Sequence, residues 1–94
     1  MADSDGDAIR TWLVERTYSD DELNLVILTY ATPDGRRYFR KERALTSFSN
    51  APETTVSVLA EPNNLGDVED SDTVEWYATE ATRMRETHDP DDTL

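Results

Sequence analysis

Cysteine is absent from the 94-residue chain, lysine and histidine occur once each, and glycine occurs three times. Without cysteine the chain has no disulfide framework, no thiolate nucleophile and no cysteine-based metal site. Three glycines are too few for a phosphate-binding loop, and no P-loop, Gly-x-Gly-x-x-Gly or Gly-x-Ser-x-Gly motif occurs. The single histidine, His88, has no nucleophile beside it with which to form a triad. We therefore expect that the protein is not an enzyme and that it binds no cofactor.

Long apolar runs are missing as well. No stretch approaches the roughly 18 apolar residues that a membrane-spanning helix needs. The chain begins Met-Ala-Asp-Ser-Asp-Gly-Asp, which lacks both the basic start and the apolar stretch of a secretory signal peptide. We therefore expect a cytoplasmic protein with no membrane partner.

Basic residues are scarce and acidic residues dominate. The chain has 21 Asp and Glu against nine Lys and Arg, a formal net charge of -12, and Lys41 is its only lysine. Such a charge repels itself at ordinary ionic strength, whereas at molar salt the Debye length falls to about 3 Å and the repulsion is largely screened. The composition therefore indicates a salt-adapted surface. The acidic runs at 3–7 and 67–72 lack the residue spacing of an EF-hand, so they predict no metal site.

Apolar patterning predicts a folded domain rather than a disordered acidic chain. β-branched and aromatic residues between turn signals predict four strands, at residues 9–18, 23–32, 36–43 and 54–60. Proline and glycine in Pro33-Asp34-Gly35 favour a tight turn, so residues 23–43 are expected to form a β-hairpin. The expected fold is α+β, a four-stranded antiparallel β-meander with one C-terminal helix packed on one face.

A single domain is expected over residues 9–88, with a flexible acidic lead at 1–8 and a disordered acidic tail at 89–94. Two other arrangements fit the same pattern: a half-open barrel closed by the helix, and a dimer whose sheets pair across chains. Residues 23–32 are apolar on both faces, which is typical of a central strand covered on both sides. One helix covers only one side, so a loop or another chain covers the other, and we expect a homodimer.

The C-terminal helix and the first strand each predict an apolar face. Asp72 is the expected N-cap of the helix, with Glu75 reaching back to it in a capping box. The apolar stripe at helical spacing comprises Val74, Tyr77, Ala78, Ala81 and Met84. Alternation along the first strand places Trp12, Val14 and Tyr18 on one face.

The third strand gathers five of the nine basic residues into eight positions. A face that carries an aromatic ring between cations can stack a base and hold phosphates. The candidate residues for binding an anion, a nucleic acid or an acidic partner are Arg36, Arg37, Phe39, Arg40, Lys41 and Arg43. Because alternate residues of a strand share a face, Arg37, Phe39, Lys41 and Arg43 are expected on one side. In the competing interpretation, these cations pair with carboxylates of neighbouring strands and loops.

Two aromatic residues are candidates for a protein interface. Trp76 lies towards the edge of the helical apolar stripe, and Phe48 lies in a polar loop. Exposed aromatic rings on so acidic a protein would mark a contact surface. Burial of both by a curled sheet is the alternative.

The expected function is that of a non-enzymatic protein–protein interaction or regulatory accessory module with an unknown protein partner. The alternative is a nucleic-acid or nucleotide-binding domain that uses the basic aromatic strand at 36–43. The stretches Trp-Leu-Val-Glu-Arg-Thr-Tyr at 12–18 and Tyr-Ala-Thr-Pro-Asp-Gly-Arg-Arg-Tyr-Phe at 30–39 have the character of a family signature. With this composition, the chain resembles the small acidic uncharacterised proteins of haloarchaea. The resemblance implies a salt-rich cytosol and no particular site.

Overall fold

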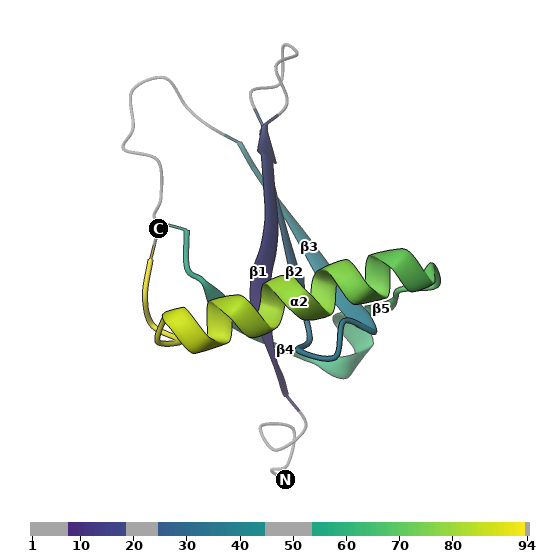
Figure 1. The fold of residues 1–94 in the computed structure, drawn as a ribbon. Helices are drawn as coiled ribbons and strands as arrows, with labels where there is room; N and C mark the ends of the chain where they lie inside the picture. The colour runs from purple at the N-terminus through teal and green to yellow at the C-terminus, as the bar shows by residue number, and fades with distance from the viewer. Residues whose placement is uncertain (1–7, 19–24, 45–53, 94) are drawn as a thin grey trace, which may run out of the picture.

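One antiparallel sheet and one C-terminal helix make up the fold, as expected for the α+β class (Figure 1). The computed structural model describes residues 8–18, 25–44 and 54–93. Its elements in chain order are β1 (Ile9–Tyr18), β2 (Leu25–Ala31), β3 (Arg37–Ala44), β4 (Ser57–Ala60), the 3₁₀ turn η1 (Pro62–Asn64), β5 (Gly66–Asp67) and α2 (Ser71–Thr87). Helix α2 crosses one face of the sheet, and the upper ends of β1, β2 and β3 extend beyond it in this view.

The sheet has five strands in the order β4-β1-β2-β3-β5, so the expectation of a four-stranded meander is wrong in strand number and in the place of the fourth strand. The hairpin expected over residues 23–43 is present as β2 and β3. β4 pairs with β1 at one edge of the sheet instead of with β3. β5 adds to β3 at the other edge, where it pairs only with Arg37 and Tyr38.

The turn between β2 and β3 follows the chemistry of its residues. The Gly35 N–H donates to the Thr32 carbonyl oxygen at 2.8 Å, and Gly35 has a φ of 74°, which glycine adopts without steric cost. The Asp34 carboxylate accepts hydrogen bonds from the Thr32 hydroxyl at 2.6 Å and the Arg36 N–H at 3.0 Å. These two bonds, with the nearby arginine charges, hold the pKa of Asp34 below its ordinary value.

β1 contains a β-bulge at Val14, where its register with β2 shifts by one residue. Trp12 lies opposite Ala31 and Tyr18 lies opposite Val26. Because these two β2 residues are an odd number of positions apart, Trp12 and Tyr18 lie on opposite faces of the sheet. The expectation that Trp12, Val14 and Tyr18 share one face is therefore wrong for Tyr18.

β2 is the central strand, as its two-sided apolar pattern predicts. Val26, Leu28 and Tyr30 share one face of β2 and Ala31 lies on the other, and all four are at most 5% exposed. Both faces of β2 are therefore buried within a single copy of the chain. Burial of this strand does not by itself require a second copy.

The helix buries the stripe that its sequence predicts, but it begins earlier. Tyr77, Ala81 and Met84 are buried against the sheet. The N-cap is Asp70, whose carboxylate accepts a hydrogen bond from the Thr73 N–H at 3.0 Å, and not Asp72. The expected capping box is therefore wrong by two residues.

The chain after α2 returns to the start of β4. The Val56 N–H donates to the Asp92 carbonyl oxygen at 3.0 Å, and Thr55 forms an isolated bridge with Thr93. Val56 is fully buried. These contacts join residues 89–93, which lie in the expected acidic tail, to the edge of the sheet.

Candidate functional site

The two faces of the sheet differ in charge. We name the face that α2 covers the helix face and the other the far face. The register places these described residues of the three central strands on the far face: Leu13, Arg16, Tyr18, Val26, Leu28, Tyr30, Arg37, Phe39 and Lys41. None of them is acidic, and the two acids of these strands, Glu15 and Glu42, lie on the helix face. The far face of the central strands therefore carries positive charge in a chain whose net charge is -12.

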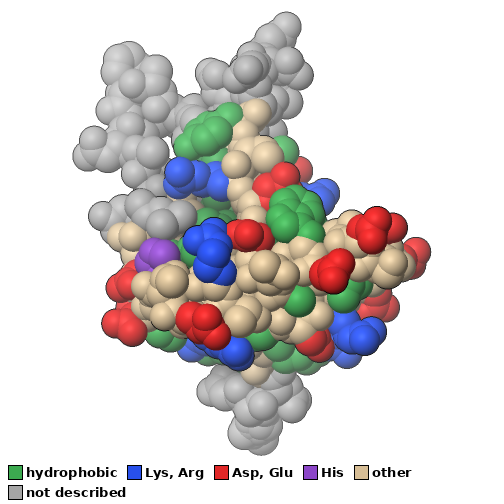
Figure 2. Space-filling model, viewed as in Figure 1, with side chains coloured by type: hydrophobic (Ala, Val, Ile, Leu, Met, Phe, Trp, Pro, Cys, Tyr) green, Lys and Arg blue, Asp and Glu red, His purple; other side chains and the backbone are tan. Residues whose placement is uncertain are grey.

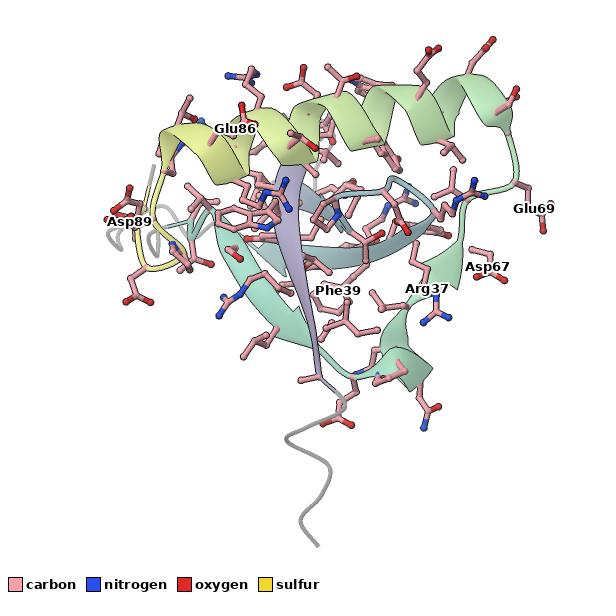
Figure 3. All side chains as sticks on the ribbon, turned by 60° about the horizontal axis from the view of Figure 1, so that its bottom comes forward. Arg37, Phe39, Asp67, Glu69, Glu86 and Asp89 are labelled. Carbon is pink, nitrogen blue, oxygen red and sulfur yellow. The ribbon has the colours of Figure 1, made fainter. Side chains whose placement is uncertain are left out.

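The structure brings three of the candidate residues together on the far face. Arg37, Phe39 and Lys41 alternate along β3 as predicted, and Figure 3 shows Arg37 and Phe39 on the side of the sheet away from α2. Asp67 of β5 lies opposite Arg37 at the end of this face. It makes no ion pair with Arg37 within 4.0 Å in the part of the chain that the structure describes.

The other candidates are dispersed. Arg40 lies on the helix face, and Arg36 lies in the turn before β3. The backbone of Arg43 belongs to β3, but its side chain lies outside the described residues, as does all of Phe48.

No described cation of β3, nor Arg36 in the turn before it, forms an ion pair with a carboxylate among the described residues. Arg36, Arg37 and Arg40 are exposed and Lys41 is half-buried. Among the described residues, the one ion pair joins Arg83 to Glu80 within α2, at 2.7 Å. Arg36 and Arg37 nevertheless lie close enough to Asp34 for their charges to lower its pKa, so internal pairing remains the competing interpretation.

Phe39 packs into the core more than the strand pattern suggests. It is half-buried, and its ring centroid lies 6.2 Å from that of the buried Tyr30. A ring held in this way offers only part of its surface for stacking.

Sequence reasoning missed Arg16 and Tyr18 as members of this surface. Tyr18 is 58% exposed on the far face, and the Arg16 guanidinium lies 5.9 Å from its ring centroid. Across the sheet, Arg16 and Lys41 lie on either side of Leu28. Strict alternation along β1 would place Arg16 and Tyr18 on the same face as Trp12. The bulge at Val14 shifts the alternation by one residue and brings both to the far face. No local signal in β1 marks the bulge.

A pocket of about 440 Å³ lies on the helix face beside β3. Tyr38, Arg40, Asp67, Val68, Glu69, Asp70, Thr73 and Tyr77 line it. The Arg40 guanidinium lies 5.7 Å from the Tyr38 ring centroid. Burial raises the pKa of Tyr77, and the Glu15 charge raises it further, while Arg40 opposes the shift. Because basic and acidic residues both line the pocket, its charge selects no single class of ligand.

Trp76 is 44% exposed, and its ring lies tilted at 47° to that of Tyr77 with ring centroids 5.1 Å apart. The view onto α2 in Figure 2 shows hydrophobic side chains in small separate patches between charged ones. An isolated exposed ring of this kind is a weaker indication of an interface than a continuous apolar patch.

Within the described ranges, no group of three or more His, Asp or Glu side chains is arranged to hold a metal ion. The same part of the chain contains no helix with the length and apolar character needed to cross a membrane.

These features define a small α+β domain: one helix on one face of a five-stranded antiparallel sheet whose opposite face carries cations. Residues 5–94 match the sequence model of DUF7967, a family of unknown function, and the chain belongs to that family. No curated protein and no solved structure matches the chain. Its function has to be argued from the surface described above.

Proposed function

We propose that the protein is a non-enzymatic protein–protein interaction module that binds an acidic partner on the far face of its sheet. One observation carries the proposal. Arg16, Arg37 and Lys41 share that face, no carboxylate lies among the far-face positions of the three central strands, and none of the three cations has an ion-pair partner among the described residues.

The arrangement is unusual for this chain because acids outnumber bases by 21 to nine. Random placement would put carboxylates beside most cations, where each pair contributes a few tenths of a kcal/mol. Asp67 lies opposite Arg37, but Arg16 and Lys41 have no acid opposite them in the register, and cations placed in this way provide complementarity to a negative partner and raise its association rate. Arg16 and Lys41 are two strand spacings apart, about 10 Å, on either side of the buried Leu28, so one acidic partner reaches both without contact to β2.

Single-stranded nucleic acid is the second candidate partner, and the pair of Arg16 and Tyr18 favours it. An exposed ring beside a guanidinium is a stacking site for a base. One observation favours a protein instead: Phe39 is held against Tyr30, which leaves only part of the Phe39 ring accessible for base stacking.

Titration with two probes tests the proposal. Poly-L-glutamate and poly(U) are added to the wild type and to the Arg37→Glu/Lys41→Glu variant over a range of KCl concentrations. We expect the wild type to prefer poly-L-glutamate, and the variant to bind it at least about tenfold more weakly.

The matched control is Arg36→Glu/Arg85→Glu, which changes the net charge equally at exposed positions outside the far face. Its affinity should fall less than about threefold. Equal weakening of both variants would mean that net charge, and not the far face, controls binding. Tighter binding of poly(U) would replace the protein partner with a nucleic acid.

A further inference from the structure

Two hydrogen bonds establish which backbone groups of β3 point out of the sheet. The Arg36 carbonyl oxygen accepts from the Val68 N–H at 2.9 Å, on the β5 side. The Arg37 carbonyl oxygen accepts from the Thr32 N–H at 3.1 Å, on the β2 side. Because backbone groups alternate along a strand, even-numbered residues of β3 direct their N–H and C=O outward and odd-numbered residues direct theirs toward β2.

Beyond Tyr38, the outer edge of β3 is open as far as the described residues are concerned. β5 pairs with Arg37 and Tyr38 only, and from Phe39 to Ala44 no other described residue pairs with this side of β3. Among the described residues of β3, the outward groups that remain are the N–H and C=O of Arg40, Glu42 and Ala44. An open edge of this kind is a template for another strand.

We propose that a second copy of the chain occupies this edge, so that two β3 strands pair antiparallel about a two-fold axis at Lys41. The inference is independent of the acidic partner proposed above. It follows from the positions of the free backbone groups and of the charges on either side of Lys41.

Charge selects one register. Under two-fold symmetry the outward residues must pair with one another, so the axis passes through residue 40, 41, 42 or 43. An axis at Arg40 would require Tyr38, which β5 already occupies. An axis at Glu42 places Glu42 opposite its own copy, and an axis at residue 43 pairs Glu42 with Ala44 and gives it no opposite charge.

An axis at Lys41 places Arg40 opposite Glu42 of the second copy, and the reverse. Both pairs lie at backbone-bonded positions, which gives four ladder hydrogen bonds and two opposite-charge pairs on the helix face. The ladder ends at Phe39 because Gly66 lies opposite Tyr38.

Lys41 opposite its own copy is the unfavourable contact of this register. Two like charges directly across a ladder destabilise it, and salt weakens their repulsion. The contact lies on the far face, where the two copies form one continuous surface with their cations side by side. The dimer is therefore expected to strengthen with salt and when Lys41 is replaced by threonine.

Disulfide crosslinking tests the register, because the chain contains no cysteine of its own. Lys41→Cys places two sulfurs across a non-hydrogen-bonded pair with Cα atoms about 4.5 Å apart, within the range for a disulfide. Arg40→Cys is the matched control, since its two copies would lie about 8 Å apart, too far to bridge. On mild oxidation in molar KCl, we expect Lys41→Cys to crosslink at least tenfold faster than Arg40→Cys.

Charge exchange tests the pair itself by size exclusion with light scattering. The wild type is expected at twice the chain mass of 10.7 kDa. Glu42→Arg should lower the dimer affinity at least tenfold because it faces Arg40, and the double variant Arg40→Glu/Glu42→Arg should restore it.

Two outcomes overturn the inference. One is a wild type that remains monomeric at millimolar concentration in molar KCl, with equal crosslinking of the two cysteine variants. The other is a dimer that Glu42→Arg leaves intact, which would place the interface elsewhere. Neither outcome affects the titration with poly-L-glutamate, which tests binding to the far face separately.

Discussion

Gly35 of the β2–β3 turn lies against Ala78 of α2, so closely that a Cβ on Gly35 would come within 2.7 Å of the Ala78 nitrogen and would overlap the Val74 carbonyl oxygen. Gly35 also has a positive φ, 74°. Gly35→Ala is therefore expected to lower the free energy of unfolding by about 2–5 kcal/mol, from left-handed backbone strain and from displacement of the helix. Urea unfolding followed by circular dichroism measures the loss.

Gly66→Ala provides the comparison for this contact. A Cβ on Gly66 would meet the edge of the Tyr38 ring at 2.9 Å, and a side chain can move where helix backbone cannot. We expect a loss of about 1 kcal/mol. Similar losses in the two variants would show that the turn does not depend on its fit beneath α2.

Asp34→Ala removes the acceptor for the Thr32 hydroxyl and the Arg36 N–H, and should cost about 1 kcal/mol at pH 7. The folded-state pKa of Asp34 is lowered, so its contribution is present above the unfolded-state pKa, near 3.8, and is lost as pH falls through the folded-state value. Unfolding curves of the wild type and the variant should therefore converge as the pH falls below that range. A difference that stays constant with pH would assign the loss to something other than the carboxylate.

The helix cap offers a comparison between two neighbouring aspartates. Asp70 accepts a hydrogen bond from the Thr73 N–H, whereas Asp72 lies in the first turn of α2. Asp70→Ala should lower the free energy of unfolding by about 1 kcal/mol, and Asp72→Ala by only a few tenths. Thermal unfolding separates the two, and a larger effect at Asp72 would favour the cap that the sequence predicts.

Salt should stabilise the chain. The net charge of -12 makes the compact state repel itself, and raising KCl from 0.05 M to 1 M shortens the Debye length from above 10 Å to about 3 Å. The free energy of unfolding should rise over that range. The variant Glu75→Gln/Glu86→Gln, at two exposed positions of α2, should gain stability at low salt and respond less to KCl. Equal salt dependence of the two proteins would argue against charge repulsion.

Amide exchange should alternate along β3. The Phe39 and Lys41 N–H groups point toward β2 and should exchange slowly at every protein concentration. The Arg40 N–H points outward and should be protected only where a second copy pairs with it, so its exchange should slow as concentration rises and should be fast in the Glu42→Arg variant. Nuclear magnetic resonance resolves these amides singly. Fast exchange of the Arg40 N–H at all concentrations would show that no second copy pairs with this edge of β3.

Local signals were sufficient for the hairpin and the helix but not for the sheet edges. The turn at 33–35 and the apolar stripe ending at Met84 each depend on residues close in sequence, and both were predicted. The pairing of β4 with β1 joins segments nearly fifty residues apart, as in the contact of Thr11 with Val58, so no local pattern specifies it. β5 is two residues long and has too little pattern to predict.

The candidate surface was predicted in part for the same reason. Alternation along β3 correctly grouped Arg37, Phe39 and Lys41, because β3 pairs with β2 without interruption. The contributions of Arg16 and Tyr18 depend on the bulge in β1, which arises from pairing between strands. Which edge of β3 remains open depends on where β5 stops, and only the assembled sheet shows that.

The bulge at Val14 also makes one position of β1 dispensable for strand register. Without Val14, Leu13 would still lie opposite Tyr30 and Glu15 opposite Thr29, so every later side chain would keep its face. Deletion of Val14 would remove one buried valine side chain and straighten the strand. The acidic and basic residues of β1 would remain on their present faces of the sheet. Family members that differ in length by one residue at this point should therefore present the same surface.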